Sequence, residues 1–294
     1  MSGEIYALAC ALLWALSSAL LKSQTHKIHV VFLGALRTIP ALLIYWGIVL
    51  FTGRVGELLN LPVRSWAYLA GSTLIGLVVG DSIYFQSMKL IGLSRAMPLS
   101  TTYPFFTMLL SLLFLDERFG WTVIGGAVLI AGGGYLLALH RGKERLVESQ
   151  AVRRINSTGV VLALCAALCW SISTVLLRVG LEKADTTLAN VVRLSVLMVA
   201  LFAMTLKLGK IERVKAYGAR SLGIVFLAGI VGTGLGTFTF LTAVQRAGAA
   251  RTSILTATTP LFGVPFSLLL KERPSSRTLV GTSLTMVGVW LTLW

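Results

Sequence analysis

The sequence has few charged residues and very few acidic ones. Only 13% of its 294 residues are Asp, Glu, Lys or Arg, and 11 are acidic. A typical soluble domain has roughly 25% charged residues. Hydrophobic residues make up 56% of the chain, and the mean hydropathy is +0.84. A soluble globular protein is therefore excluded.

Cysteine and histidine are also scarce, with three of each. Cys10, Cys165 and Cys169 lie inside apolar stretches, which argues against a disulfide framework. No His or carboxylate stands near the Cys165 and Cys169 pair to complete a metal site. The phosphate-binding pattern GxxxxGK[ST] does not occur. We expect no cofactor and no metal, and a driving force that comes from ion or substrate gradients.

The formal net charge of +15 does not indicate nucleic acid. The Lys and Arg residues sit in short segments between apolar spans, not in a continuous stripe with interleaved aromatic residues. Juxtamembrane basic residues are attracted to anionic lipid head groups. Membrane lipids are therefore the expected partner, and nucleic acid is not.

Apolar stretches recur along the whole chain, and each approaches the roughly 20 helical residues that cross a bilayer core. We predict ten of them, at residues 5–21, 30–51, 66–88, 96–115, 121–139, 159–177, 187–206, 221–244, 252–270 and 279–294. The fold class expected is an all-α, multi-pass integral membrane protein of the cell membrane.

The two halves of the chain are copies of one another. A shift of 156 residues aligns Trp14 with Trp170 and Arg37 with Arg193. It also aligns several glycines with glycines and Pro104 with Pro260. After the prolines the shift falls by one residue, and Glu117 meets Glu272. Such internal repeats are common in transporters, which place the substrate site between the two halves.

The expected organisation is two five-helix repeats at 1–139 and 159–294, joined by a polar, partly helical linker at 140–158. Because five is odd, the second repeat enters the membrane from the opposite side, so the repeats are related by inverted topology. Both termini then lie on one side. That side carries 7 of the Lys and Arg residues in the loops, against 17 on the other, which weakly favours an extracytoplasmic location for the termini.

Each half contains a glycine-spaced helix, a short Gly-containing turn, a Ser/Thr-rich stretch, a proline and a terminal Glu-Arg, at 76–118 and 232–273. This ordered set, followed by a Gly-rich last helix, resembles the EamA domain of the drug/metabolite transporter superfamily. The resemblance covers both halves almost entirely and implies a ten-helix secondary transporter. It also implies that helices 1, 3, 4, 6, 8 and 9 line a central cavity, and that helices 5 and 10 are peripheral. Most characterised relatives are taken to have cytoplasmic termini, in contrast to the charge count.

Asp81 is the only one of the 11 acidic residues that lies well within a predicted span, and its repeat partner is the neutral Thr237. An ionisable group at such a depth usually faces a cavity or a charged partner. Asp81 could carry a coupling proton or bind a cationic group of the substrate. The structural alternative is an ion pair with Arg37, Arg193 or Lys89.

The arginines fall into two symmetric pairs. Arg37 and Arg193 lie about two turns into the second helix of each repeat, and their symmetry favours a scaffolding role. Arg95 and Arg251 lie beside the turn before helices 4 and 9 and are candidate gate residues. Pro104 and Pro260 lie within predicted spans, where we expect each to bend its helix.

Aromatic and hydroxyl residues complete the candidate substrate site, since aromatic walls with a few polar groups suit a small organic molecule. The predicted substrate-binding residues are Trp14, Ser17, Asp81, Tyr84, Tyr103, Thr107, Trp170, Ser173 and Thr259. We predict no catalytic residues.

These features predict a secondary active transporter that exports a small polar or amphipathic, amino acid-like metabolite by alternating access. Protons are a candidate coupling ion and a homodimer a candidate assembly. An exchanger of anionic or phosphorylated metabolites is the alternative, with Lys22, Lys89, Arg95, Arg178 or Arg251 as binding residues. An intramembrane enzyme is disfavoured because Asp81 has no second carboxylate or His at its depth. A channel is disfavoured because Asp81 opposite Thr237 breaks the symmetry of a ring.

Overall fold

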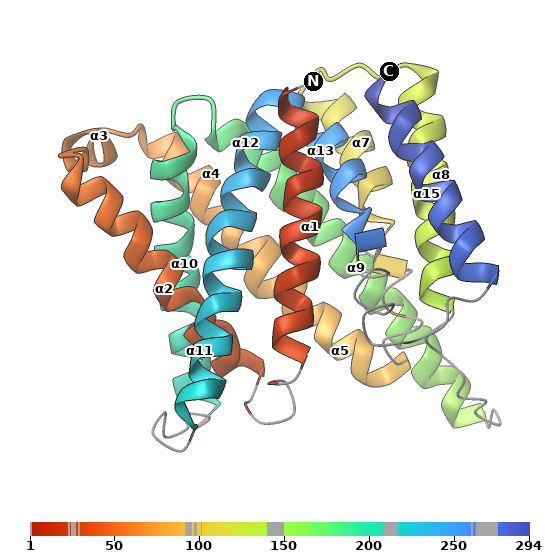
Figure 1. The fold of residues 1–294 in the computed structure, drawn as a ribbon, viewed down its shortest axis with the longest axis horizontal. Helices are drawn as coiled ribbons and strands as arrows, with labels where there is room; N and C mark the ends of the chain where they lie inside the picture. The colour runs from red at the N-terminus through yellow and green to blue at the C-terminus, as the bar shows by residue number, and fades with distance from the viewer. Residues whose placement is uncertain are drawn as a thin grey trace.

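The computed structural model describes residues 2–22, 24, 28, 30–91, 96, 99–100, 102–139, 150–208, 217–259, 261–262 and 276–294, and these form helices and connecting turns without a strand. The first half contains α1 (Ser2–Lys22), α2 (Val30–Phe51), α3 (Val55–Leu59), α4 (Val63–Thr73), η1 (Leu74–Gly80), α5 (Asp81–Ile91), α7 (Tyr103–Phe114) and α8 (Trp121–Leu139) (Figure 1). The second half contains α9 (Gln150–Gly180), α10 (Thr186–Lys207), α11 (Ala219–Ala228), η3 (Gly229–Gly236), α12 (Thr237–Ala247), α13 (Ala249–Thr256) and α15 (Ser276–Leu293).

The apolar composition of these helices suits a membrane. Six stretches are long and apolar enough to span one: Gly3–Leu21, Val31–Phe51, Val63–Ile91, Ser157–Gly180, Thr186–Lys207 and Ala219–Ala247. Three shorter apolar helices are Tyr103–Phe114, Trp121–Gly133 and Val280–Leu293. Nine of the ten predicted stretches thus overlap one of these apolar helices. The tenth, 252–270, overlaps α13, and its residues 260 and 263–270 lie outside the described residues. The last residues of the predicted linker belong to α9.

The third span of each half contains a π-helical segment that the sequence analysis did not predict. η1 separates α4 from α5, and η3 separates α11 from α12 at the matched position. π-Helical turns are wider than α-helical turns and occur frequently at functional sites. Asp81 and Thr237 are the first residues after the two segments. The repeat therefore duplicates an irregular backbone as well as a sequence pattern.

The two halves exchange their first helices. α1 packs along α11, η3 and α12 of the second half, and α9 packs along α4, η1 and α5 of the first. Small residues allow these close contacts, because a β-carbon on Gly76 would lie 2.3 Å from Ser173 Oγ, and one on Gly232 would lie 2.3 Å from Ser17 Oγ. Each third span is thus held by a helix from the other repeat.

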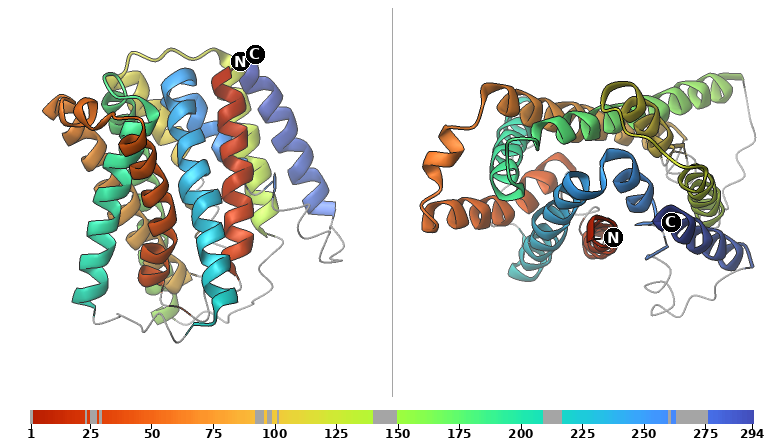
Figure 2. Two further views of the ribbon diagram at one scale, coloured as in Figure 1. Left: turned by 60° about the vertical axis from the view of Figure 1, so that its left-hand side comes forward. Right: turned by 90° about the horizontal axis from the view of Figure 1, so that it is seen from above.

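α8 and α15, the last helices of the two halves, pack along each other at one edge of the bundle (Figure 2). A β-carbon on Gly126 would lie 2.6 Å from the Gly288 carbonyl oxygen, and one on Gly133 would lie 2.5 Å from that of Gly281. The outer faces expose large apolar residues such as Trp121 and Trp290. This peripheral place is the one that the family resemblance implied.

Pro104 lies at the start of a helix. α7 begins at Tyr103, so Pro104 occupies its first turn, where a proline costs no hydrogen bond. In the second half, α13 ends at Thr256, and a turn at Ala257 and Thr258 follows. Pro260 lies outside the described residues.

Both ends of the chain lie at the same end of the bundle, as predicted, and α1 and α9 run in opposite directions (Figure 1). We call this end the terminal end. The short connections from α2 to α4, from α7 to α8, from α9 to α10 and from α12 to α13 also lie there.

Candidate functional site

Asp81 lies at the junction of η1 and α5 and is half-buried. The indole Nε1–H of Trp170, on α9, donates a hydrogen bond of 2.9 Å to Asp81 Oδ1. A hydrogen bond to an ionised acceptor is stronger than a neutral one. The contact joins the two repeats, because Trp170 comes from the helix that the second half contributes to the first.

Two tyrosines extend this contact into a cluster. Tyr84, one turn after Asp81, lies with its ring centroid 5.2 Å from that of Trp170. Tyr103, the first residue of α7, makes an edge contact with Trp170 at 6.2 Å. We call Asp81, Tyr84, Tyr103 and Trp170 the Asp81 cluster. The sequence analysis predicted all four residues for one site, and they come together from α5, α7 and α9.

Among the described residues, Asp81 forms no direct ion pair. None of their basic groups lies within 4.0 Å of its carboxylate. The charge of Arg37 interacts with Asp81 at longer range, and Lys89 is exposed. Asp81 is thus held by an uncharged donor.

The two symmetric arginines have different partners. Arg193 is only 4% exposed, and its Nε donates to Thr73 Oγ1 at 3.3 Å. The repeat partner of Thr73 is Gly229, which packs against the backbone carbonyl of Arg37. The Arg193 side chain thus links α10 to the third span of the first half, whereas Arg37 makes its contact through its backbone. The scaffolding role of the two arginines stays a prediction.

A second cluster occupies the matched place in the other third span. Trp14 stands beside Gly236 as Trp170 stands beside Gly80, and its ring centroid lies 5.3 Å from that of Phe240, the repeat partner of Tyr84. Thr237 replaces Asp81. We call Trp14, Thr237, Phe240 and Asn190 the Thr237 cluster.

The hydroxyl of Thr237 is engaged within its own half. It contacts the carbonyl oxygen of Thr233, that of Gly234 at 3.3 Å, and Asn190 Oδ1 at 3.1 Å. Asn190 is 1% exposed, and its amide nitrogen has no described partner. Asn190 was not predicted from the sequence. A signal was present, because Asn190 is a polar residue within a predicted apolar span and its repeat partner is Gly34.

Most of the other predicted hydroxyl residues serve packing. Ser17 Oγ donates to the Ala228 carbonyl at 2.9 Å, and Ser173 Oγ donates to that of Ser72 at 2.6 Å. Thr107, fully buried, donates to the Tyr103 carbonyl, and Thr259 donates to that of Thr256. These hydroxyl groups tie helices or close local turns.

The candidate gate residue Arg251 forms an ion pair with Glu4, at 3.1 Å, between α13 and the start of α1. Its symmetric partner Arg95 lies outside the described residues. Glu117, from the terminal Glu-Arg of the first repeat, accepts the backbone N–H groups of Ala249 at 2.8 Å and Ala250 at 3.2 Å. A carboxylate at a helix N-terminus is stabilising. Glu117 therefore caps α13 from the other half.

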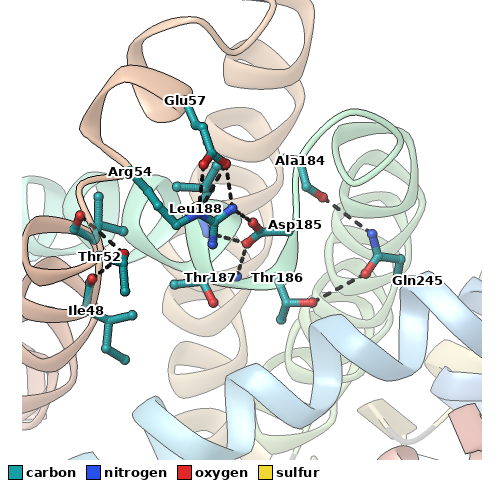
Figure 3. Close-up of polar contacts among 11 residues, drawn as sticks. Ile48, Thr52, Arg54, Glu57, Ala184, Asp185, Thr186, Thr187, Leu188 and Gln245 are labelled. Carbon is teal, nitrogen blue, oxygen red and sulfur yellow. Dashed lines mark hydrogen bonds and ion pairs between the residues drawn. The ribbon is translucent and has the colours of Figure 1, made fainter.

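A third tie at the terminal end joins Arg54, after α2, to Asp185, before α10 (Figure 3). Arg54 also pairs with Glu57 at 2.7 Å, and hydrogen bonding to Glu57 and Asp185 raises the pKa of its guanidinium. Asp185 in turn caps α10, accepting the N–H of Thr187 at 2.7 Å. The sequence analysis did not single out these residues, because their contact depends on how the two halves meet.

The described basic residues of the anionic alternative do not gather. Arg178 donates to the Gln245 carbonyl at 3.1 Å, Arg251 pairs with Glu4, and Lys89 is exposed. The Lys22 side chain and Arg95 lie outside the described residues. Among the described residues, no group of three or more His, Cys, Asp or Glu could hold a metal ion.

Comparison with known proteins places these features in context. The model of the EamA-like transporter family matches residues 1–139 and 157–294. An "Uncharacterized transporter" of Archaeoglobus fulgidus is 26% identical over 76% of this chain and 74% of its own length. An "Uncharacterized transporter in cobO 3'region" of Sinorhizobium is 31% identical over 47% of this chain and 97% of its own. One crystal structure matches with a TM-score of 0.80 at 20% identity, over 99% of this chain and 95% of the other, which shows a shared fold.

Proposed function

The chain belongs to the EamA-like transporter family, and from this premise we propose that it exports a small polar or amphipathic, amino acid-like metabolite by secondary active transport. It is a multi-pass integral membrane protein, and the family points to a transporter rather than an enzyme. The cell membrane is the usual location of such proteins. The observation that carries the proposal is the Asp81 cluster, in which a membrane-depth carboxylate and three aromatic rings meet between the two repeats.

The proposed architecture is ten spans in two inverted repeats, 1–139 and 159–294, with the linker 140–158 between them. Three observations support it: the duplicated π-helical segments, the exchanged first helices and the opposite directions of α1 and α9. In transporters built this way, the substrate site lies near the midplane at the repeat interface. The Asp81 cluster occupies such an interface.

Asp81 is the proposed coupling or substrate-binding group. Its carboxylate accepts one indole hydrogen bond and has no described ion-pair partner. A carboxylate in this state can bind a proton or an ammonium group without first breaking a salt bridge. The aromatic rings beside it suit either an amine or an apolar side chain of the substrate.

Alternating access requires that contacts between the halves break and form again. At the terminal end, three ties cross between the repeats: Glu4 with Arg251, Arg54 with Asp185, and Glu117 with the start of α13. We assign these ties to a gate that is closed in this conformation. The substrate would then enter or leave through the opposite end of the bundle.

Reconstitution into liposomes tests the function. Purified protein would be assayed for uptake of labelled amino acids, amines and phosphorylated metabolites, with and without a pH gradient. We expect amino acid uptake that Asp81→Asn uncouples from the pH gradient, because Asn keeps the size and the acceptor oxygen but cannot titrate. Asp116→Asn is the matched control, since Asp116 lies in a turn at φ 53°, a conformation that Asn also tolerates.

The outcomes separate the alternatives. Uptake of phosphorylated metabolites alone would favour the anionic exchanger. Gradient-driven uptake that survives in Asp81→Asn would exclude Asp81 as the coupling group. Loss of folded protein in this variant alone would instead assign Asp81 to structure.

A further inference from the structure

The two clusters differ in the hydrogen bonding of their tryptophan N–H groups. The indole N–H of Trp170 donates to Asp81, whereas that of Trp14 makes no hydrogen bond within the described part of the chain. Trp14 is half-buried, and its Nε1 is not among the buried nitrogen and oxygen atoms that lack a partner, so the N–H group can be reached by water or by a ligand. A hydrogen bond from such a donor to a charged acceptor is stronger than one to a neutral acceptor.

The place beside Trp14 is matched to the place beside Trp170. A β-carbon on Gly80 would lie 3.1 Å from Trp170 Nε1, and one on Gly236 would lie 2.9 Å from Trp14 Nε1. The next residue is Asp81 in one case and Thr237 in the other. The two indoles therefore contact the ends of η1 and η3 in the same way. They differ in the residue that follows, which carries a carboxylate in one half and a hydroxyl in the other.

Thr237 is not the acceptor for the Trp14 N–H that Asp81 is for the Trp170 N–H. Its single hydroxyl proton already has three acceptors in its own half: the carbonyl oxygens of Thr233 and Gly234, and Asn190 Oδ1. The threonine hydroxyl oxygen is also one bond closer to the backbone than the carboxylate oxygens of aspartate. The Trp14 N–H thus lies beside a segment end where the other half of the molecule has a carboxylate and this half has a hydroxyl.

We propose that the transported molecule supplies this carboxylate, and that the indole N–H of Trp14 binds it. The inference rests on the proposed transport function and narrows its substrate class to carboxylic acids. Asp81, whose second oxygen accepts no described hydrogen bond, is the complementary acceptor for the ammonium group of an amino acid. The repeat then offers a donor for a carboxylate in one cluster and an acceptor for an ammonium group in the other.

The test uses the indole N–H signals of the seven tryptophans in a ¹H–¹⁵N spectrum of the full chain in nanodiscs. Trp14→Phe assigns the Trp14 signal. The probes are L-leucine, 4-methylpentanoate, which lacks the amine, and 3-methylbutylamine, which lacks the carboxylate. We expect leucine and 4-methylpentanoate to shift the Trp14 signal saturably and the amine to leave it in place. Trp14→Phe is expected to weaken leucine binding, followed by calorimetry, about tenfold.

Two variants make the test independent of the natural substrate. Thr237→Asp recreates the carboxylate of the other half, so it should shift the Trp14 signal without any probe and abolish the response to 4-methylpentanoate. Thr237→Asn is its control, with a side chain of the same shape and no charge. Trp46→Phe removes an indole that donates to Ser195 between α2 and α10, and should leave probe binding unchanged.

The failure of this inference is distinct from the failure of the transport proposal. A Trp14 signal that ignores carboxylate probes and Thr237→Asp, in protein that transports amino acids, overturns the role of Trp14 alone. A Trp14 signal that responds in protein that transports none of the panel overturns the transport proposal alone. An equal loss of amine and leucine binding in Trp14→Phe would reduce Trp14 to an aromatic packing group.

Discussion

The Asp81 cluster and the Thr237 cluster are built on one plan and have different chemistry. In both, a tryptophan from the other repeat stands at the end of a π-helical segment, and an aromatic ring follows one turn later. One cluster has a carboxylate that takes the indole proton, and the other has a hydroxyl that does not. Duplication thus supplies the same frame twice. Differences at matched positions, Asp81 against Thr237 and Tyr84 against Phe240, then make the first cluster more polar than the second.

The packing that frames both clusters should be equally sensitive in the two halves. Gly76→Val and Gly232→Val each place a β-carbon 2.3 Å from a serine oxygen of the exchanged helix. We expect each to cost about 3 kcal/mol, at the upper end of the effect of overpacking, because the helices must separate. Unfolding in a denaturing detergent series measures this.

Gly132→Val is the control for these variants, since a β-carbon there meets nothing within 4 Å. A large loss in one half only would contradict the equivalence of the two exchanged contacts.

Substitution of the two tryptophans should reduce stability unequally, in contrast to substitution of the two glycines. Trp170→Phe removes the hydrogen bond to the Asp81 carboxylate, and we expect a loss of about 1.5 kcal/mol of unfolding free energy. Trp14→Phe removes no described hydrogen bond, so its loss should be smaller in the absence of substrate. The same detergent series compares the two. Equal losses would show that the clusters do not differ in this respect.

The serines that tie the exchanged helices provide a smaller and symmetric test. Ser17→Ala and Ser173→Ala each remove one hydroxyl bond to a backbone carbonyl. We expect about 1 kcal/mol for each, because neutral hydrogen bonds contribute that much on average. Thermal unfolding followed by tryptophan fluorescence is sufficient. Unequal values would show that the two interfaces are not equivalent.

The smallest effect is expected outside both clusters, at Glu57. The hydrogen bond and charge of Arg54 lower the pKa of this carboxyl in the folded protein. The stabilisation is therefore present above the pKa of the unfolded chain, about 4.3, and is lost as the pH falls through the folded value. Glu57→Gln should remove this acid dependence and leave stability at pH 7 nearly unchanged, since Glu57 is exposed. Unfolding midpoints between pH 3 and pH 7 would reveal it, and an unaltered profile would contradict it.

Much of the fold could be predicted because a membrane-spanning helix can be recognised from the composition of its own stretch of sequence. The spans at 30–51 and 121–139 coincide with α2 and α8, since length and apolarity alone decide whether a segment crosses a bilayer. The π-helical segments could not be predicted this way, because a wider turn changes neither property. Composition also does not show that the described helix of the fourth span begins at Tyr103, which places Pro104 in its first turn.

The residues of the candidate site were predicted better than the contacts that they make. Asp81, Tyr84, Tyr103 and Trp170 were all singled out, and they meet. Ser17 and Ser173 were singled out as well, but they bind backbone. Sequence shows that a polar group is buried in a span, and it does not show which neighbour the group faces.

The amino-acid sequence by itself determined that the chain is a duplicated, helical membrane protein, because hydropathy and a repeat at constant spacing need no knowledge of packing. It also determined that Asp81 breaks the symmetry of the repeat. The tertiary structure alone decided that the first helices are exchanged, that Trp170 rather than an arginine holds Asp81, and that Arg54 meets Asp185. These contacts join residues far apart in the sequence, 89 positions for Asp81 and Trp170 and 131 for Arg54 and Asp185. Only the way in which the two halves pack brings such residues together.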